Sequence, residues 1–193
     1  MEVSNISQSL TTKIYSDLQV AYDYFNRELF DGRLPECLLV LSYHRTAFGY
    51  FRSKPFMTRE QLEEYAAVEA ETDDPDELEE YRRAGPGVDE ISLNIFYFRD
   101  RTVPQIMSTL VHEMVHLEQF HFGTPPKRPT HNKEWGSMMK RIGLHPSESG
   151  APGGKETGRR VSHYVVEGGP FERVVTGLPV TLDWVGLLQI GRA

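Results

Sequence analysis

Cysteine is almost absent from this sequence, because Cys37 is the only one among 193 residues. One thiol cannot form a disulfide within the chain, and it cannot supply the four sulfur ligands of a cysteine zinc ribbon. Proteins without disulfides are typical of reducing compartments, so the cytoplasm is the simplest expectation.

Long apolar segments are missing as well. No apolar run approaches the about 18 residues that suggest a membrane helix. The first ten residues, MEVSNISQSL, lack the basic and apolar regions of a signal peptide. We therefore expect no contact with a membrane. The hydrophobic content of 39% is typical of a globular protein, and the chain is long enough for one domain with its own core.

Basic residues are absent between Glu60 and Glu80, where eleven acids occur without a Lys or Arg. Of the 28 acids in the chain, 17 therefore lie elsewhere, against 21 Lys and Arg. The net charge of −7 thus arises in one segment, while the rest of the chain is mildly basic. We interpret residues 58–84 as a solvated helical insertion. Alternatively, this acidic segment repels nucleic acid or covers a site.

The hydrophobic pattern predicts an α+β domain. We expect helices over 11–31, 58–83, about 102–122 and 132–142, because apolar residues recur there at helical spacing between proline or glycine breaks. The helical region 58–83 is broken at Asp74-Pro75, and a capping box at Thr102–Gln105 begins the helix over 102–122. Short apolar or aromatic runs predict strands over 37–43, 47–52 and 91–98. Composition predicts a flexible loop over 145–160 and a hairpin of 161–167 with 171–176.

Four of the seven histidines lie between Leu110 and Trp135. His112 and His116 are four residues apart on the predicted helix, so their side chains lie one turn apart on the same face. Glu113 stands beside the first histidine, which gives the pattern H-E-x-x-H of zinc hydrolases. In this chemistry, neutral imidazoles hold zinc and the glutamate accepts a proton from the attacking water. Without a metal, the two histidines would be ordinary polar residues on a helix surface.

A catalytic zinc usually takes three protein ligands and keeps one position open. The metzincin spacing would require Gly at 119 and His at 122, where this chain has Gln119 and Phe122. His121 lies about 140° around the helix from His116 and is poorly placed. His131, at the start of the next predicted helix, is the favoured third ligand, and Glu134 is the alternative.

The chain resembles the SprT-like family of metallopeptidases in its histidine pattern: HEMVH is followed, after fourteen intervening residues, by a further histidine in HNKEW. The segment AYDYFNRELFDGRLP, the SLN–YF strand and SHYVVEGGPF are also similar to that family, over about residues 12–176. The resemblance implies a zincin-like fold, in which a small, mainly antiparallel sheet packs on the helix of the histidine pair and on an N-terminal helix. Residues 177–193 would be a C-terminal tail.

The resemblance also implies an activity: a zinc-dependent endopeptidase in or near nucleic-acid metabolism, acting on proteins bound or crosslinked to DNA. Carried over by position, His112, His116 and His131 would hold one zinc ion, and Glu113 would be the general base. The strand 91–98 would be the edge on which an extended peptide pairs. The C-terminal zinc ribbon of many members is absent from this sequence.

Several other residues are candidates for accessory roles. His163 and Tyr164 could stabilise the transition state, although such a pair is more often a structural part of a strand. Lys127, Arg128 and Lys133 lie beside the proposed metal and could contact a polyanion such as DNA or an acidic substrate, although such residues are more often part of a solvated loop. Glu118 and Glu134 are considered as hydrogen-bond partners of the metal histidines.

Two other functions remain open from the sequence. One is a nucleic-acid-associated binding or regulatory module with a structural zinc, and the other is a zinc hydrolase of a non-peptide substrate. The intact Glu113 argues against the first, because a structural site needs no base.

Overall fold

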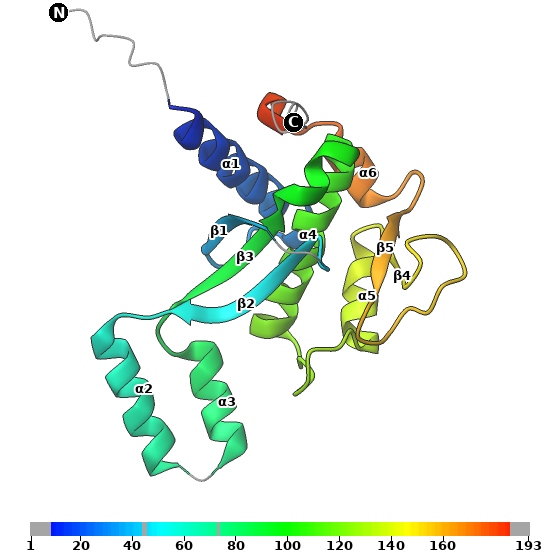
Figure 1. Cartoon of the computed structure of the whole chain (residues 1–193). Coiled ribbons are helices and arrows are strands. Elements are labelled where there is room, and N and C mark those ends of the chain that lie inside the picture. Colours follow the sequence, from blue (N-terminus) through cyan, green and yellow to red (C-terminus); the bar gives the residue numbers. More distant parts are fainter. Residues whose placement is uncertain (1–8, 44–45, 73, 186–193) are drawn as a thin grey trace, which may run out of the picture.

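The computed structural model describes residues 9–43, 46–72 and 74–185 (Figure 1). In chain order, its elements are α1 (Leu10–Phe30), β1 (Cys37–Ser42), β2 (Gly49–Phe56), α2 (Arg59–Glu71), α3 (Pro75–Ala84), β3 (Val88–Asn94), the 3-10 helix η1 (Ile95–Asp100), α4 (Val103–Phe122), α5 (Lys133–Arg141), β4 (Leu144–Ser147), β5 (Ser162–Val165) and α6 (Pro170–Val175). The predicted α+β class is confirmed.

Helix α4 lies at the centre of the molecule (Figure 1). Fourteen of its 20 residues are buried. It packs against β2 and β3 on one side and against α5 on another, while α1 and α6 also contact it. Its first turn is held by the predicted capping box, in which Thr102 and Gln105 bond each other's backbone N–H groups. A rigid, buried helix is therefore available to position its polar side chains.

The main sheet has the strand order β1-β3-β2. β1 pairs with β3 in parallel and β2 pairs with it antiparallel, whereas β4 and β5 form a separate antiparallel pair. Two of these three pairings are antiparallel, in line with the predicted small, mainly antiparallel sheet. β4 and β5 lie with α5 on the opposite side of α4 from the main sheet (Figure 1).

The expected edge strand over 91–98 is wrong in two respects. The strand ends at Asn94, because the Asn94 side chain accepts the N–H of Phe96 and thereby caps η1. β3 is also the central strand, with neighbours on both edges. Its backbone is therefore unavailable to a peptide, and β2 is the edge strand that lies next to α4.

The expected hairpin of 161–167 and 171–176 is also wrong. β5 pairs with β4, which lies in the segment expected to be a flexible loop, and residues 170–175 form α6. Pro170 stands in the first turn of this helix. Proline is well tolerated there because its missing N–H has no partner in a helix in any case. The Gly168-Gly169-Pro170 sequence thus begins a helix instead of joining two strands.

The acidic segment forms the two predicted helices, α2 and α3, which project from the sheet between β2 and β3 (Figure 1). Asp74 caps α3 and Pro75 follows it, as the break at this dipeptide predicted. No residue of α2 is buried. Lys54, at the end of β2, donates to the carbonyls of Arg83 and Gly85 and so ties the base of the pair to the sheet.

Part of the predicted tail packs on the core. Leu182, Trp184 and Val185 are buried, and the Trp184 indole donates to Asp17 of α1. Residues 186–193 lie outside the described part, and the domain limits of 12–176 stay a prediction. None of the described helices is long and apolar enough to cross a membrane.

Cys37 supplies a test of this packing. Burial raises the pKa of its thiol to about 12, and only the thiolate reacts readily with disulfide reagents. We expect the native protein to react far more slowly at about pH 8 than the chain unfolded in guanidinium. The release of a coloured thiol by an aromatic disulfide measures both rates. Equal rates would show that β1 is not covered as described.

Candidate metal centre

Helix α4 brings the histidine pair together. His112 and His116 are one turn apart, and their ring centroids are 5.2 Å from each other. Both belong to the part of α4 that lies against α5. The geometry expected from the H-E-x-x-H spacing is therefore present in the folded helix.

His131 reaches the pair through the connection between α4 and α5. Its ring centroid lies 4.9 Å from that of His116 and 5.5 Å from that of His112. One ring nitrogen from each of the three histidines lies within 4.8 Å of the others. Within the described residues, this is the one group of histidine, cysteine and acidic side chains that could hold a metal ion.

Trp135 forms the base of the three-histidine group. It is fully buried. Its ring lies 4.2 Å from that of His131 and stacks on His116 at 5.3 Å, measured between centroids. A large rigid side chain under the imidazoles restricts their rotation, so the group is preorganised for one metal geometry.

The three imidazoles are in the protonation state that a metal requires. Burial lowers the pKa of His116 to about 3 and that of His112 well below its ordinary value. Burial also lowers the pKa of His131. Metal ions bind the neutral form of imidazole, so no proton has to be removed near neutral pH.

Hydrogen bonds select which nitrogen of each ring is free. The Nδ1 of His131 lies 3.0 Å from the carbonyl oxygen of Gly158 and donates to it, which leaves Nε2 as the lone-pair nitrogen. The Nδ1 of His112 lies 3.0 Å from the Nδ1 of His163 on β5. His112 therefore also has Nε2 available for a metal.

Gln119 is a residue of this site that the sequence did not indicate. It is buried on α4, one turn beyond His116. Its Nε2 donates to Asn132 Oδ1 at 2.9 Å and to Glu134 Oε2 at 2.6 Å. Asn132 in turn caps α5 by accepting the N–H of Trp135. Gln119 thus fastens the start of α5, and with it His131, to the histidine helix.

Glu113 is buried between α4 and the edge strand β2. Gly49 of β2 makes this contact possible, because a Cβ at this position would lie 3.1 Å from Glu113 Oε1 and 2.8 Å from the Ser92 carbonyl oxygen. Burial raises the pKa of the Glu113 carboxyl to about 8. A carboxyl with such a pKa can accept and return a proton near neutral pH.

A cleft of about 610 Å³ opens over these residues. Its floor includes His112, Glu113 and His116 of α4. One wall is formed by residues 46–51 at the start of β2, and the other by residues 159–163, which lead into β5. His131 and the preceding prolines close one end. The volume suits a few side chains of an extended ligand.

The remaining candidates lie in different places. Glu134, the alternative third ligand, is outside the three-histidine group and bonds Gln119 and the N–H of Thr124. Glu118 is completely buried and pairs with Arg33 and Arg141. Neither carboxylate is a partner of the metal histidines, so that expectation is wrong.

His121 pairs with Asp89 at 2.6 Å, away from the site, as its position on the helix predicted.

Of the residues proposed for accessory roles, the fold places some in the cleft lining and others outside it. His163 lines the cleft, whereas Tyr164 stacks on His145 and is not part of the lining. Lys127, Arg128 and Lys133 are all exposed, and of these only Arg128 lines the cleft.

Comparison with known proteins agrees with this geometry. A family model described as the SprT-like family matches residues 18–154, which include the three histidines and Glu113 but not His163. An uncharacterized protein in the mucB 3' region of Salmonella typhimurium is 44% identical over 50 residues, or 26% of this chain and 68% of that protein. No solved structure matches the chain.

Gln119 provides a test of how His131 is positioned. Replacing it by leucine removes the bonds to Asn132 and Glu134, and we expect the zinc affinity to fall by about tenfold. Competition with a chromogenic chelator measures this affinity. Gln19→Leu is the matched control, because Gln19 bonds Asp23 on the exposed surface of α1. An unchanged affinity in Gln119→Leu would show that His131 is held by other contacts.

Proposed function

Since this chain belongs to the SprT-like family, we propose that it is a zinc-dependent endopeptidase in which His112, His116 and His131 hold the metal. The observation that carries this proposal is the three-histidine group beside a buried glutamate at the floor of a cleft. A structural zinc site is normally closed by four protein ligands. Among the described residues this group has three members, which is the number that leaves a position for water.

The metal and the base have complementary roles in this proposal. Zinc in the site would supply Lewis acidity, which lowers the pKa of a water molecule toward ~7 and stabilises negative charge on a carbonyl oxygen. Glu113 takes the proton of the attacking water and passes it to the leaving amine. The raised pKa of Glu113 makes its carboxylate a stronger base for accepting this proton.

His163 is the proposed hydrogen-bond donor to the oxyanion. Burial and the nearby charge of Arg101 lower the pKa of His163 to about 4, so it is neutral near pH 7. When His112 uses Nε2 for the metal, its Nδ1 carries a hydrogen and donates to the Nδ1 of His163. The single hydrogen of His163 then lies on Nε2. A neutral donor at the cleft wall can stabilise charge that develops in the transition state.

The edge of β2 is the proposed track for the peptide. Gly49, Tyr50 and Phe51 line the cleft, and β3 occupies only one side of this strand. The backbone of an edge strand can pair with an extended chain, which holds the scissile bond in a defined register. β2 thus takes the part that the sequence assigned to residues 91–98.

The substrate proposal follows from the family. We propose proteins bound or crosslinked to DNA as substrates, in the reducing cytoplasm that the single cysteine favours. Lys127 and Lys133 are exposed beside His131 and outside the cleft lining, so they are available to a nucleic acid that carries the substrate protein, whereas Arg128 lines the cleft.

The base and the metal ligands can be tested separately. Glu113→Gln should retain zinc and lose at least about 10²-fold in activity, because a proton acceptor is removed while the three imidazoles stay. His131→Ala should lose most of the zinc. We would measure zinc content and cleavage of a DNA-binding protein, with and without single-stranded DNA.

The outcomes separate the functions. Cleavage by the wild type alone supports the peptidase, and stimulation by DNA supports the crosslink substrate. An inactive wild type with one tightly bound zinc would favour a structural zinc in a binding module, or a hydrolase of a non-peptide substrate. Full zinc occupancy in His131→Ala would contradict the ligand assignment.

His163 has a test of its own. His163→Leu should lower kcat by about 10²-fold with a smaller change in KM, because the lost donor acts mainly in the transition state. His163→Gln, which keeps an N–H donor, should recover part of the rate. Tyr164→Phe is the matched control on the same strand. A loss of zinc in His163→Leu would mean that His163 only supports His112.

A further inference from the structure

The two walls of the cleft differ in chemistry. The wall at the start of β2 is aromatic and includes Phe48, Tyr50 and Phe51. Three arginines line the rest of the cleft: Arg128 between α4 and α5, and Arg159 and Arg160 before β5; we call them the arginine wall. An extended chain on β2 would therefore face these guanidinium groups across the cleft.

Among residues 9–43, 46–72 and 74–185, these three arginines have no acidic partner. Within the described part of the chain, no ion pair is formed by Arg128, Arg159 or Arg160, and all three are exposed. By contrast, Arg33 and Arg141 are paired with Glu118. Glu148 also lines the cleft, but its carboxylate lies 3.9 Å from the ammonium of Lys155. The wall therefore offers positive charge that is free for a ligand.

The position of Arg159 and Arg160 is set by the metal histidines. Gly158 exchanges two backbone hydrogen bonds with His131, at 2.8 and 3.0 Å. Val161 is buried, and His163 bonds His112. The two arginines are thus held between one residue that contacts the third histidine and another that contacts the first. Their distance from the scissile bond is consequently constrained from both ends.

We propose that this arginine wall selects peptides with aspartate or glutamate side chains within a few residues of the scissile bond. The inference rests on the proposed peptidase function and adds its substrate preference. A guanidinium binds a carboxylate through two parallel hydrogen bonds, which gives direction as well as charge. The aromatic wall would accept apolar side chains on the other face of the same peptide.

The charge distribution favours a peptide over a nucleic acid as the ligand of these arginines. They line the same cleft of about 610 Å³ as Glu113 and the histidines, and do not form a track on an outer face. The acidic helices α2 and α3 follow the far end of β2, where they would repel a long polyanion lying along that strand (Figure 1). A short acidic segment near the metal would not extend to these helices.

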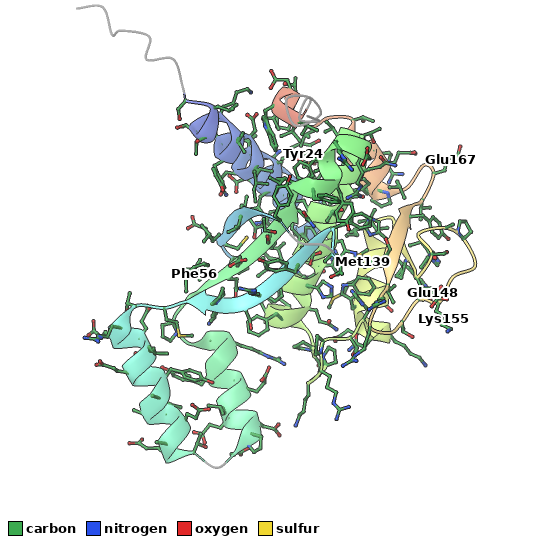
Figure 2. The ribbon with its side chains drawn as sticks, in the orientation of Figure 1. Tyr24, Phe56, Met139, Glu148, Lys155 and Glu167 are labelled. Carbon is green, nitrogen blue, oxygen red and sulfur yellow. The ribbon has the colours of Figure 1, made fainter. Side chains whose placement is uncertain are left out.

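Lys155 lies outside the arginine wall. Glu148 and Lys155 lie on the loop that extends away from α4, at the outer side of the molecule (Figure 2). Lys155 is exposed and is not part of the cleft lining. It therefore offers a control position on the same loop as Arg159 and Arg160.

The test compares cleavage and binding of three otherwise identical fluorogenic peptides, with Glu, Gln or Lys on both sides of one apolar segment. We expect the wild-type kcat/KM for the Glu peptide to exceed that for the Gln peptide by about tenfold. The double variant Arg159→Glu with Arg160→Glu should reverse the order and favour the Lys peptide. The preference should weaken at high salt, because exposed charges are screened.

Matched variants distinguish the effect of the arginine wall on the peptide preference from the effect of general surface charge. Arg128→Glu should reduce the Glu preference, whereas Lys127→Glu, one residue away and outside the cleft lining, should not. Lys155→Arg, which keeps the pair with Glu148, should also leave the preference unchanged. Circular dichroism and zinc content show that each variant folds and holds metal.

Binding of the three peptides to the Glu113→Gln protein tests the inference without any peptide cleavage. Tighter binding of the Glu peptide without cleavage by the wild type would support the arginine wall and contradict the peptidase. Cleavage of all three peptides at equal rates would overturn the inference and leave the peptidase standing. Equal or undetectable peptide binding, with single-stranded DNA binding that depends on Arg159 and Arg160, would assign these arginines to nucleic acid and overturn the proposal.

Discussion

The burial of helix α4 is the constraint on which the rest of the structure depends. A buried polar group is costly unless it is hydrogen-bonded, and α4 buries several. Four of them bond side chains outside the helix: Thr109 bonds Arg101, His112 bonds His163, Glu118 pairs with Arg33 and Arg141, and Gln119 bonds Asn132 and Glu134. The segments that form the cleft are therefore held around α4 by the polar groups of α4 itself.

This arrangement joins stability to the proposed chemistry. The bonds of Gln119 to Asn132 and Glu134 stabilise the fold, and they also place His131 beside His116. The bond between His112 and His163 satisfies two buried rings, and it also determines which nitrogen of each is free. A substitution at Gln119 is consequently expected to affect folding and metal binding together.

The close contact of α4 with β2 has a similar double effect. Without a side chain at Gly49, Glu113 can lie against the edge strand, so the proposed base and the proposed peptide track are neighbours. The second wall reaches the site from a segment distant in sequence, through the bridge between His131 and Gly158. The proposed metal ligands, base, peptide track and charged wall thus meet within one cleft although they come from four parts of the chain.

The sequence by itself determined the features that depend on short spacing: the caps and breaks of the helices, the His112–His116 pair with Glu113, and the family. The tertiary structure decided what depends on partners far along the chain. It made β3 central and β2 the edge, turned Pro170–Val175 into a helix, and gave Gln119 and Gly158 their contacts with the site. Local periodicity reports which side of a segment is apolar, but it carries no information on which distant segment satisfies a buried hydrogen-bonding group.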